Sequence, residues 1–482
     1  MKGSRWIGPG VGVAILFAFL LLPPFEPLTT LGMKTVGVFL FTIVWWATIG
    51  IGYPSFICIA LLAVTGVMTP GEAIASSMGN WLPLFLIGCF GLSEGLRITG
   101  FSRRFALWFI TRPFTAGHPW LLVSMFLLAC TLLGSVMSST ATTIVFMAIA
   151  APMLETLGYK KGDAFSATFM MGIAWAATAA LSMTPIAHAG NVMVMEWIKR
   201  DFGYTISFPQ WMLFGIPMGL LVYLIILGAF RYIVRPDVSR ITEMTTGYIR
   251  EAAAEMGAMK REEKLALGIF IVVIICWMLP GIAGGILPGV SAFLGKIGYA
   301  IPAVIGACLL CLIRVNNEPL LTFQQWMKDG VEWGSTILCA AIMAIGVAIS
   351  NPGTGILELL TGIFQPLASA VPLYIFVLIC VVWVVLQTNI MSNLVSLTLV
   401  YSIMIPVAAA ASVGNPIALG TTIAAAANYA FSLPSATTTT AIVIGSGWVS
   451  VGFLGKYGSI LIIPIVLLFT FICYGLTSII FG

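Results

Sequence analysis

The sequence contains very little charge and almost no histidine. Asp, Glu, Lys and Arg make up 8% of the 482 residues, and there are two histidines, His118 and His188. Because soluble domains carry roughly 25% charged residues, a soluble enzyme, a nucleic-acid-binding protein and a disordered scaffold are excluded. The net charge of +5 therefore indicates no nucleic-acid partner. Basic residues in loops set the orientation of a membrane protein instead.

Long apolar runs dominate what is present. Hydrophobic residues make up 60% of the chain, which also holds 50 glycines and 25 prolines. Membrane bundles tolerate both, because neighbouring helices satisfy the freed backbone groups. A membrane-spanning helix needs ~20 apolar residues, so we predict an all-α, multi-pass integral protein of the plasma membrane (the inner membrane in a bacterium). The predicted spans are 9–28, 34–50, 52–68, 81–98, 119–137, 140–157, 164–183, 211–233, 265–283, 299–313, 333–350, 371–387, 394–411, 415–433 and 457–480.

The first apolar run is predicted to be a membrane span rather than a signal peptide. Lys2 and Arg5 precede it, and no small-residue cleavage site stands before Pro23, as a signal peptide would require. Positive residues ahead of a first span predict a cytoplasmic N-terminus. The most hydrophilic segment, 231–264, is predicted to be a cytoplasmic linker near the middle of the chain.

The two halves of the chain share landmarks at nearly constant separation. Residues 137–140 align with residues 391–394, 254 positions later, and each motif is followed by an apolar run that reaches a proline. A tryptophan upstream and a threonine downstream recur after 252 and 253 positions, as Trp81 and Trp333, and Thr184 and Thr437. We therefore predict two structural repeats. The predicted division is 1–80 (N-terminal scaffold helices), 81–197 (first repeat), 198–332 (scaffold helices with the linker), 333–449 (second repeat) and 450–482 (C-terminal transmembrane helix).

Charge near the two polar motifs predicts opposite orientations. Basic residues lie on both sides of the first tip, 138–140, whereas no Lys or Arg occurs from Asp329 to Gly455 around the second tip, 392–394. Both ends of the first helix pair are therefore predicted to be cytoplasmic and both ends of the second extracellular. This pattern is typical of re-entrant hairpins in inverted repeats. Ordinary full spans are the alternative.

Each half also contains a predicted helix break. Pro185 follows Thr184, and Pro434 precedes a run of threonines at 437–440. Proline removes an amide donor and disfavours helix just before it, although a plain kink is an alternative. An unwound carbonyl suits a hard cation such as sodium, and a half-helix N-terminus suits an anion. His188 lies beside the first break and is a candidate site residue that could titrate with substrate or a proton.

The motifs resemble those of the divalent anion:sodium symporter family, which transports dicarboxylates, citrate and sulfate. The matching segments are MSSTATT (137–143), MTPIAHAGN (183–191), TNIMSNL (388–394) and FSLPSATTTTAIVIGSG (431–447). Three positions differ from the family pattern: Ser139 replaces Asn, Leu394 replaces Thr and Thr438 replaces Pro. The resemblance implies a homodimer in which a transport domain moves like an elevator against a scaffold domain.

The resemblance also implies which residues bind the substrate and the coupling ion. Carried over by position, the substrate residues are Ser138, Ser139, Thr140, Ser392 and Asn393, with Thr184, Thr437 and Thr438 nearby. One sodium ion would be held by Ser138, Ser139 and a carbonyl near Met183. The other would be held by Thr388, Asn393 and carbonyls near Met391 and Ala436.

We predict a secondary active transporter of small anions, di- or tricarboxylates, that works by sodium symport or by anion exchange. The nearest alternatives are a sodium/proton antiporter and a sulfate-type oxyanion carrier. An antiporter would place an acidic residue at a break, and none occurs at 184–191 or 434–440. An intramembrane enzyme needs a nucleophile–base pair or a metal cluster, and we expect no acidic residue near the tips. A channel is a further alternative, which saturable counterflow would exclude.

Overall fold

A computed structural model describes residues 7–112, 118–238, 240, 247, 251, 254 and 256–482. The described chain is mostly helical, and its one strand pair is β1 (Arg314–Val315) with β2 (Glu318–Pro319). Among the described residues, eight helices are long and apolar enough to cross a membrane, or up to ten if each of two bent helix pairs is one span. The prediction of an all-α, multi-pass membrane protein is confirmed.

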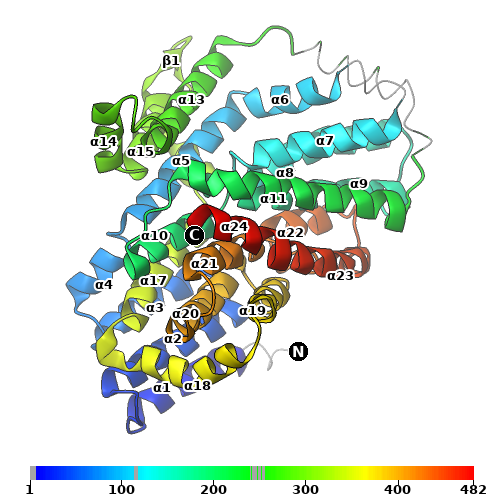
Figure 1. Cartoon of the computed structure of the whole chain (residues 1–482). Helices are drawn as coiled ribbons and strands as arrows, with labels where there is room; N and C mark the ends of the chain where they lie inside the picture. The colour runs from blue at the N-terminus through cyan, green and yellow to red at the C-terminus, as the bar shows by residue number, and fades with distance from the viewer. Residues whose placement is uncertain are drawn as a thin grey trace.

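The helices pack as two sets (Figure 1). The first set comprises α1 (Ile7–Leu21), α2 (Thr30–Thr48), α3 (Gly52–Val64), α4 (Pro70–Ser76), α5 (Trp81–Ile98), α13 (Arg261–Ile282), α14 (Pro288–Ile297), α15 (Ala300–Leu312), α16 (Phe323–Gln325), η6 (Trp326–Gly330) and α17 (Trp333–Ile349). The second comprises α7 (Pro119–Gly134), α8 (Ser139–Thr156), α9 (Ala164–Ala179), η3 (Ala180–Ser182), η4 (Pro185–Ala187), α10 (Ala189–Phe202), α11 (Phe208–Ala229), η5 (Phe230–Val234), α19 (Leu373–Thr388), α20 (Asn393–Ala411), α21 (Pro416–Ala426), α22 (Thr438–Gly445), α23 (Val451–Leu467), η8 (Leu468–Cys473) and α24 (Tyr474–Phe481). The connecting elements are α6 (Phe101–Ile110), η7 (Pro352–Thr354) and α18 (Ile356–Ala370).

The second set is built around α9, which contacts α7, α8, α11 and α22. Every residue from Phe165 to Ala179 in this helix is buried. Its apolar residues therefore face neighbouring helices on all sides, as expected of a helix at the centre of a bundle. The segment that follows α9 is thereby held deep inside the protein.

Some predicted spans differ from the observed helices. The span predicted at 415–433 ends at Ala426 in α21. Beyond it, the Asn389 carboxamide oxygen accepts hydrogen bonds from the backbone N–H groups of Phe431 (2.8 Å) and Ser432 (2.9 Å). These groups are satisfied by a side chain from α19 instead of by helix. The short helices α6, α14 and α18 had no predicted span.

Parts of two predictions lie outside the described residues. Lys2 and Arg5 belong to the first six residues, and the predicted linker 231–264 is described only in part. The C-terminal end of this segment is anchored by Glu263, in the first turn of α13, which forms an ion pair with Arg104 of α6 (2.5 Å).

Candidate functional site

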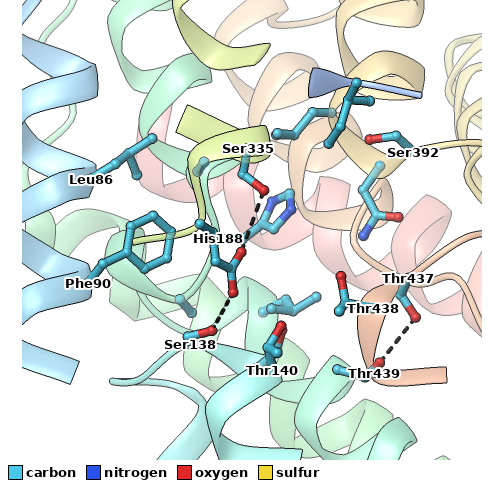
Figure 2. A pocket seen from close by; sticks show the side chains of 18 of the residues that line it. Leu86, Phe90, Ser138, Thr140, His188, Ser335, Ser392, Thr437, Thr438 and Thr439 are labelled. Carbon is cyan, nitrogen blue, oxygen red and sulfur yellow. Dashed lines mark hydrogen bonds between the residues drawn. The ribbon is translucent and has the colours of Figure 1, made fainter. Parts of the chain in front are cut away.

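A cavity of about 480 Å³ lies between the two helix sets. Figure 2 shows the side chains of Ser138, Thr140, Ser392, Thr437 and Thr438 around one space, with Leu86 and Phe90 of α5 on another side. Both polar tips and both predicted breaks contribute to the wall. No lysine or arginine is among the lining residues that the structure describes. Neutral polar groups would therefore have to hold any anion that binds here.

Four helices of the second set begin at this cavity. Their N-cap residues are Ser138 for α8, His188 for α10, Ser392 for α20 and Thr437 for α22, and all four line the cavity. The first N–H groups of a helix lack intrahelical partners and carry partial positive charge. Helix N-termini are accordingly favourable places for an anion. Four of them at one cavity place partial positive charges along its wall.

The two serine N-caps differ from the other two in how their side chains are used. His188 Nδ1 accepts a hydrogen bond from Gly190 N–H (3.2 Å), and Thr437 Oγ1 accepts one from Thr440 N–H (3.4 Å). Ser138 and Ser392 make no such capping bond. Their hydroxyl groups are therefore not committed to their own helices.

A carboxylate that the sequence analysis did not place here lies in the cavity. Glu332, just before α17, accepts a hydrogen bond from the Ser138 hydroxyl at 2.6 Å, and the Ser335 hydroxyl lies 3.5 Å from its other oxygen. The dashed lines that end at Ser138 and at Ser335 in Figure 2 mark these two contacts. The expectation of no acidic residue near the tips is therefore wrong. Glu332 is 194 positions from Ser138, so only the packing of α17 reveals their contact.

The first break occurs between α9 and α10. The Thr184 hydroxyl donates a hydrogen bond to the Ser135 carbonyl, and the Asn191 side chain donates to the carbonyls of Leu181 (2.7 Å) and Thr184 (2.9 Å). These bonds replace the helical ones that the break removes. Thr184 and Met183 are buried, and neither is among the residues that line the cavity.

The second break occurs between α21 and α22, beside the second tip. The Thr388 hydroxyl lies within hydrogen-bond distance of two acceptors, Asn393 Oδ1 (2.9 Å) and the Ala427 carbonyl (2.6 Å), for its one hydrogen. Asn393 Nδ2 donates to the Asn428 carbonyl (3.3 Å). Asn428 Nδ2 in turn donates to Asn191 Oδ1 (3.1 Å). A continuous chain of buried amides thus joins the second tip to the first break.

Each break is packed against a glycine of a neighbouring helix. A Cβ atom on Gly215 of α11 would lie 2.3 Å from the Ser182 carbonyl oxygen, and one on Gly458 of α23 would lie 2.3 Å from that of Phe431. Any larger residue would collide with the unwound backbone. The close approach packs each break tightly against a neighbouring helix.

Most residues predicted from the sequence meet in this one cavity. The predicted substrate residues that line it are Ser138, Ser139, Thr140, His188, Ser392, Asn393, Thr437 and Thr438. Met391 and Ala436 of the predicted sodium sites line it too, whereas Met183, Thr184 and Thr388 lie behind the wall. Leu394, which replaces the family threonine, also faces the cavity.

Several contributors were missed by the sequence analysis. Glu332 is the N-cap residue of α17, and Ser335 lies in its first turn. Ser93 of α5 accepts a hydrogen bond from Ser138 N–H (3.1 Å). No motif surrounds these residues. Asn191 and Asn428 had a usable signal, because an amide close to a predicted break is suited to bond the freed backbone groups.

The comparisons with known proteins give the family. A family model described as the sodium:sulfate symporter transmembrane region matches residues 4–480. The chain belongs to this family, which confirms the resemblance found in the motifs. It is a membrane transporter and not an enzyme.

Two curated relatives match nearly the whole chain. The sodium-dependent dicarboxylate transporter SdcS of Staphylococcus saprophyticus is 28% identical over 484 residues, covering 97% of this chain and 91% of the relative. The protein of the same name from Staphylococcus aureus (strain USA300) is 25% identical over 477 residues, covering 95% of this chain and 88% of the relative.

Proposed function

We propose that this protein is a secondary active transporter of small anions, di- or tricarboxylates, driven by sodium. The observation that carries the proposal is the convergence of four helix N-termini, with their hydroxyl and amide groups, on a cavity that has no lysine or arginine among its described lining. Such a site attracts an anion but leaves its charge incompletely balanced. A co-transported cation would supply the rest. The names of the relatives support both the substrate class and the ion.

The candidate sodium ligands are oxygen atoms at the tips and breaks. The first site would use Ser138, Ser139 and a carbonyl near Met183. The second would use Thr388, Asn393 and carbonyls near Met391 and Ala436. The bond between Thr388 Oγ1 and Asn393 Oδ1 (2.9 Å) supports the second set, because it already holds two of these oxygens together. Hydroxyl, amide and carbonyl oxygens are suitable ligands for a hard cation.

An elevator mechanism is consistent with the two helix sets. The tips and breaks belong to one set, which would form the transport domain together with α11, a helix predicted from the sequence to be part of the scaffold. Helices α1–α5 with α13–α17 would form the scaffold. The repeats 81–197 and 333–449 would then be related by inverted topology, with α7–α8 and α19–α20 as re-entrant hairpins. Alternating access would carry the cavity across the membrane. The carrier would work as a homodimer, and its N-terminus would be cytoplasmic.

Anion exchange without sodium is a second candidate, supported by the substituted tips. Leu394 lines the cavity without a hydroxyl, and Ser139 has a shorter side chain than the family asparagine. Either change would weaken the binding of a cation or of the anion. Exchange would then require an anion on both sides of the membrane.

Uptake of labelled succinate into proteoliposomes tests these proposals. We expect uptake that requires an inward sodium gradient and that saturates with succinate. Uptake that depends only on unlabelled internal succinate would establish exchange instead. No uptake of succinate, citrate or sulfate under either condition would contradict an anion carrier. Liposomes without protein are the control for leakage.

A further inference from the structure

Glu332 places a negative charge inside a site proposed for anions. It lies in the break between η6 and α17, where the chain bends by 72°. Its carboxylate is only partly buried and reaches the cavity. One oxygen accepts the Ser138 hydroxyl at 2.6 Å, and the other lies 3.5 Å from the Ser335 hydroxyl. A hydroxyl at the first tip is thus already bound to a carboxylate of the protein itself.

No cationic side chain in the described cavity wall neutralises this carboxylate. No lysine or arginine is among the described residues of the wall, and the Nδ1 atom of His188 is occupied as an acceptor from Gly190 N–H. Arg97 of α5 is held by both oxygens of Glu94, at 2.7 and 2.5 Å. The charge of Glu332 is therefore offset only by helix N-termini and by whatever cation the site binds.

A fixed charge discriminates between ligands by their valence. The Coulomb energy between Glu332 and a bound anion is proportional to the charge of that anion. Each additional carboxylate on the substrate is therefore repelled by Glu332. The number of helix N-termini that can attract it stays fixed at four. With two sodium ions and a dianion bound, the net charge of the site would equal the single negative charge of Glu332. With a trianion in place of the dianion, the net negative charge would be twice as large.

We propose that Glu332 is a specificity-determining residue that limits the carrier to dianions and excludes trianions. The inference rests on the proposed function and narrows its substrate class from di- or tricarboxylates to dicarboxylates. Glu332 acts through its charge and through its hold on the Ser138 hydroxyl. It therefore sets an upper limit on substrate valence without itself binding the anion.

The test compares succinate and citrate binding to wild-type protein and to Glu332→Gln. Binding is measured by titration calorimetry in saturating sodium at mildly alkaline pH, where every carboxyl group of both acids is ionised. Wild type binds succinate and not citrate. In Glu332→Gln the affinity rises by a factor of about ten for each unit of substrate charge, since about 1.4 kcal/mol of Coulomb energy per charge corresponds to tenfold. Citrate therefore gains about ten times more than succinate and becomes a ligand.

Two further variants keep the test decisive. Glu332→Asp preserves the charge and should remain selective for succinate. Glu318→Gln removes an exposed carboxylate in β2, outside the cavity, and should leave both affinities unchanged.

Three results would overturn the inference while leaving an anion carrier intact. These are wild-type binding of citrate as tight as that of succinate, equal changes for both anions in Glu332→Gln, and loss of all binding in Glu332→Gln with retention in Glu332→Asp. The last result would make Glu332 a cation ligand. Failure of wild type to bind or transport any of the anions would instead overturn the proposed function, and the inference with it.

Discussion

The two polar tips are held in different ways. The first tip is bound across the boundary between the helix sets, because Ser138 N–H donates to Ser93 of α5 (3.1 Å) and the Ser138 hydroxyl donates to Glu332 beside α17 (2.6 Å). The second tip is bound within its own set, where Asn393 contacts Thr388 (2.9 Å) and the Asn428 carbonyl (3.3 Å).

The bonds of the first tip therefore depend on how the two helix sets are placed relative to each other, whereas the bonds of the second tip do not. A movement of one helix set relative to the other would break the bonds of Ser138 and would leave those of Asn393 in place. Loss of the Asn393 side chain in the second tip should therefore be poorly tolerated at every stage of the cycle. Loss of the Ser138 side chain in the first tip should matter only in the conformation in which the two helix sets are in contact as they are in this structure.

The largest effect is expected for Asn393→Ala. The change leaves the buried Asn428 carbonyl without its side-chain partner, which costs about 1–3 kcal/mol, whereas the Thr388 hydroxyl keeps the Ala427 carbonyl as its acceptor. Succinate uptake should fall by about 100-fold, with a lower melting temperature in detergent. Asn393→Asp loses the amide donor to the Asn428 carbonyl and buries a charge, so it should be no more stable than the alanine variant. Full activity of Asn393→Ala would contradict the assignment of this tip to the site.

An intermediate effect is expected for Ser138→Ala. It removes a hydrogen bond to a charged group, which contributes about 1.5–3 kcal/mol, but Glu332 is only partly buried and the cavity can hydrate it. Uptake should fall by about tenfold, while the melting temperature changes less than in Asn393→Ala. Western blotting of membranes controls for expression. A loss of stability as large as that of Asn393→Ala would remove the distinction between the tips.

The smallest effect is expected for Ser392→Ala. The Ser392 hydroxyl makes no hydrogen bond to any residue that the structure describes, so its removal should leave the melting temperature unchanged. If this hydroxyl contacts the substrate, the KM for succinate should rise by about fivefold, corresponding to ~1 kcal/mol for a neutral hydrogen bond. An unchanged KM would show that the substrate is held without Ser392.

Local sequence patterns predicted a large part of the molecule. The apolar runs marked the helices because a bilayer requires about the same length of apolar residues from each span. The two polar tips and both breaks were found because the same polar landmarks recur in the two halves at nearly constant separation. Boundaries were less well predicted where side chains replaced helical hydrogen bonds, as Asn389 does for Phe431 and Ser432.

The sequence by itself therefore determined the class, the family and the segments that make up the site. Only the tertiary structure decided that four helix N-termini point at one cavity, that Asn428 bonds to Asn191 across 237 positions, and that Glu332 enters the site. The physical reason is that hydropathy and helix breaking act over a few residues. Contacts between helices depend instead on how entire surfaces pack, and no short motif records that packing.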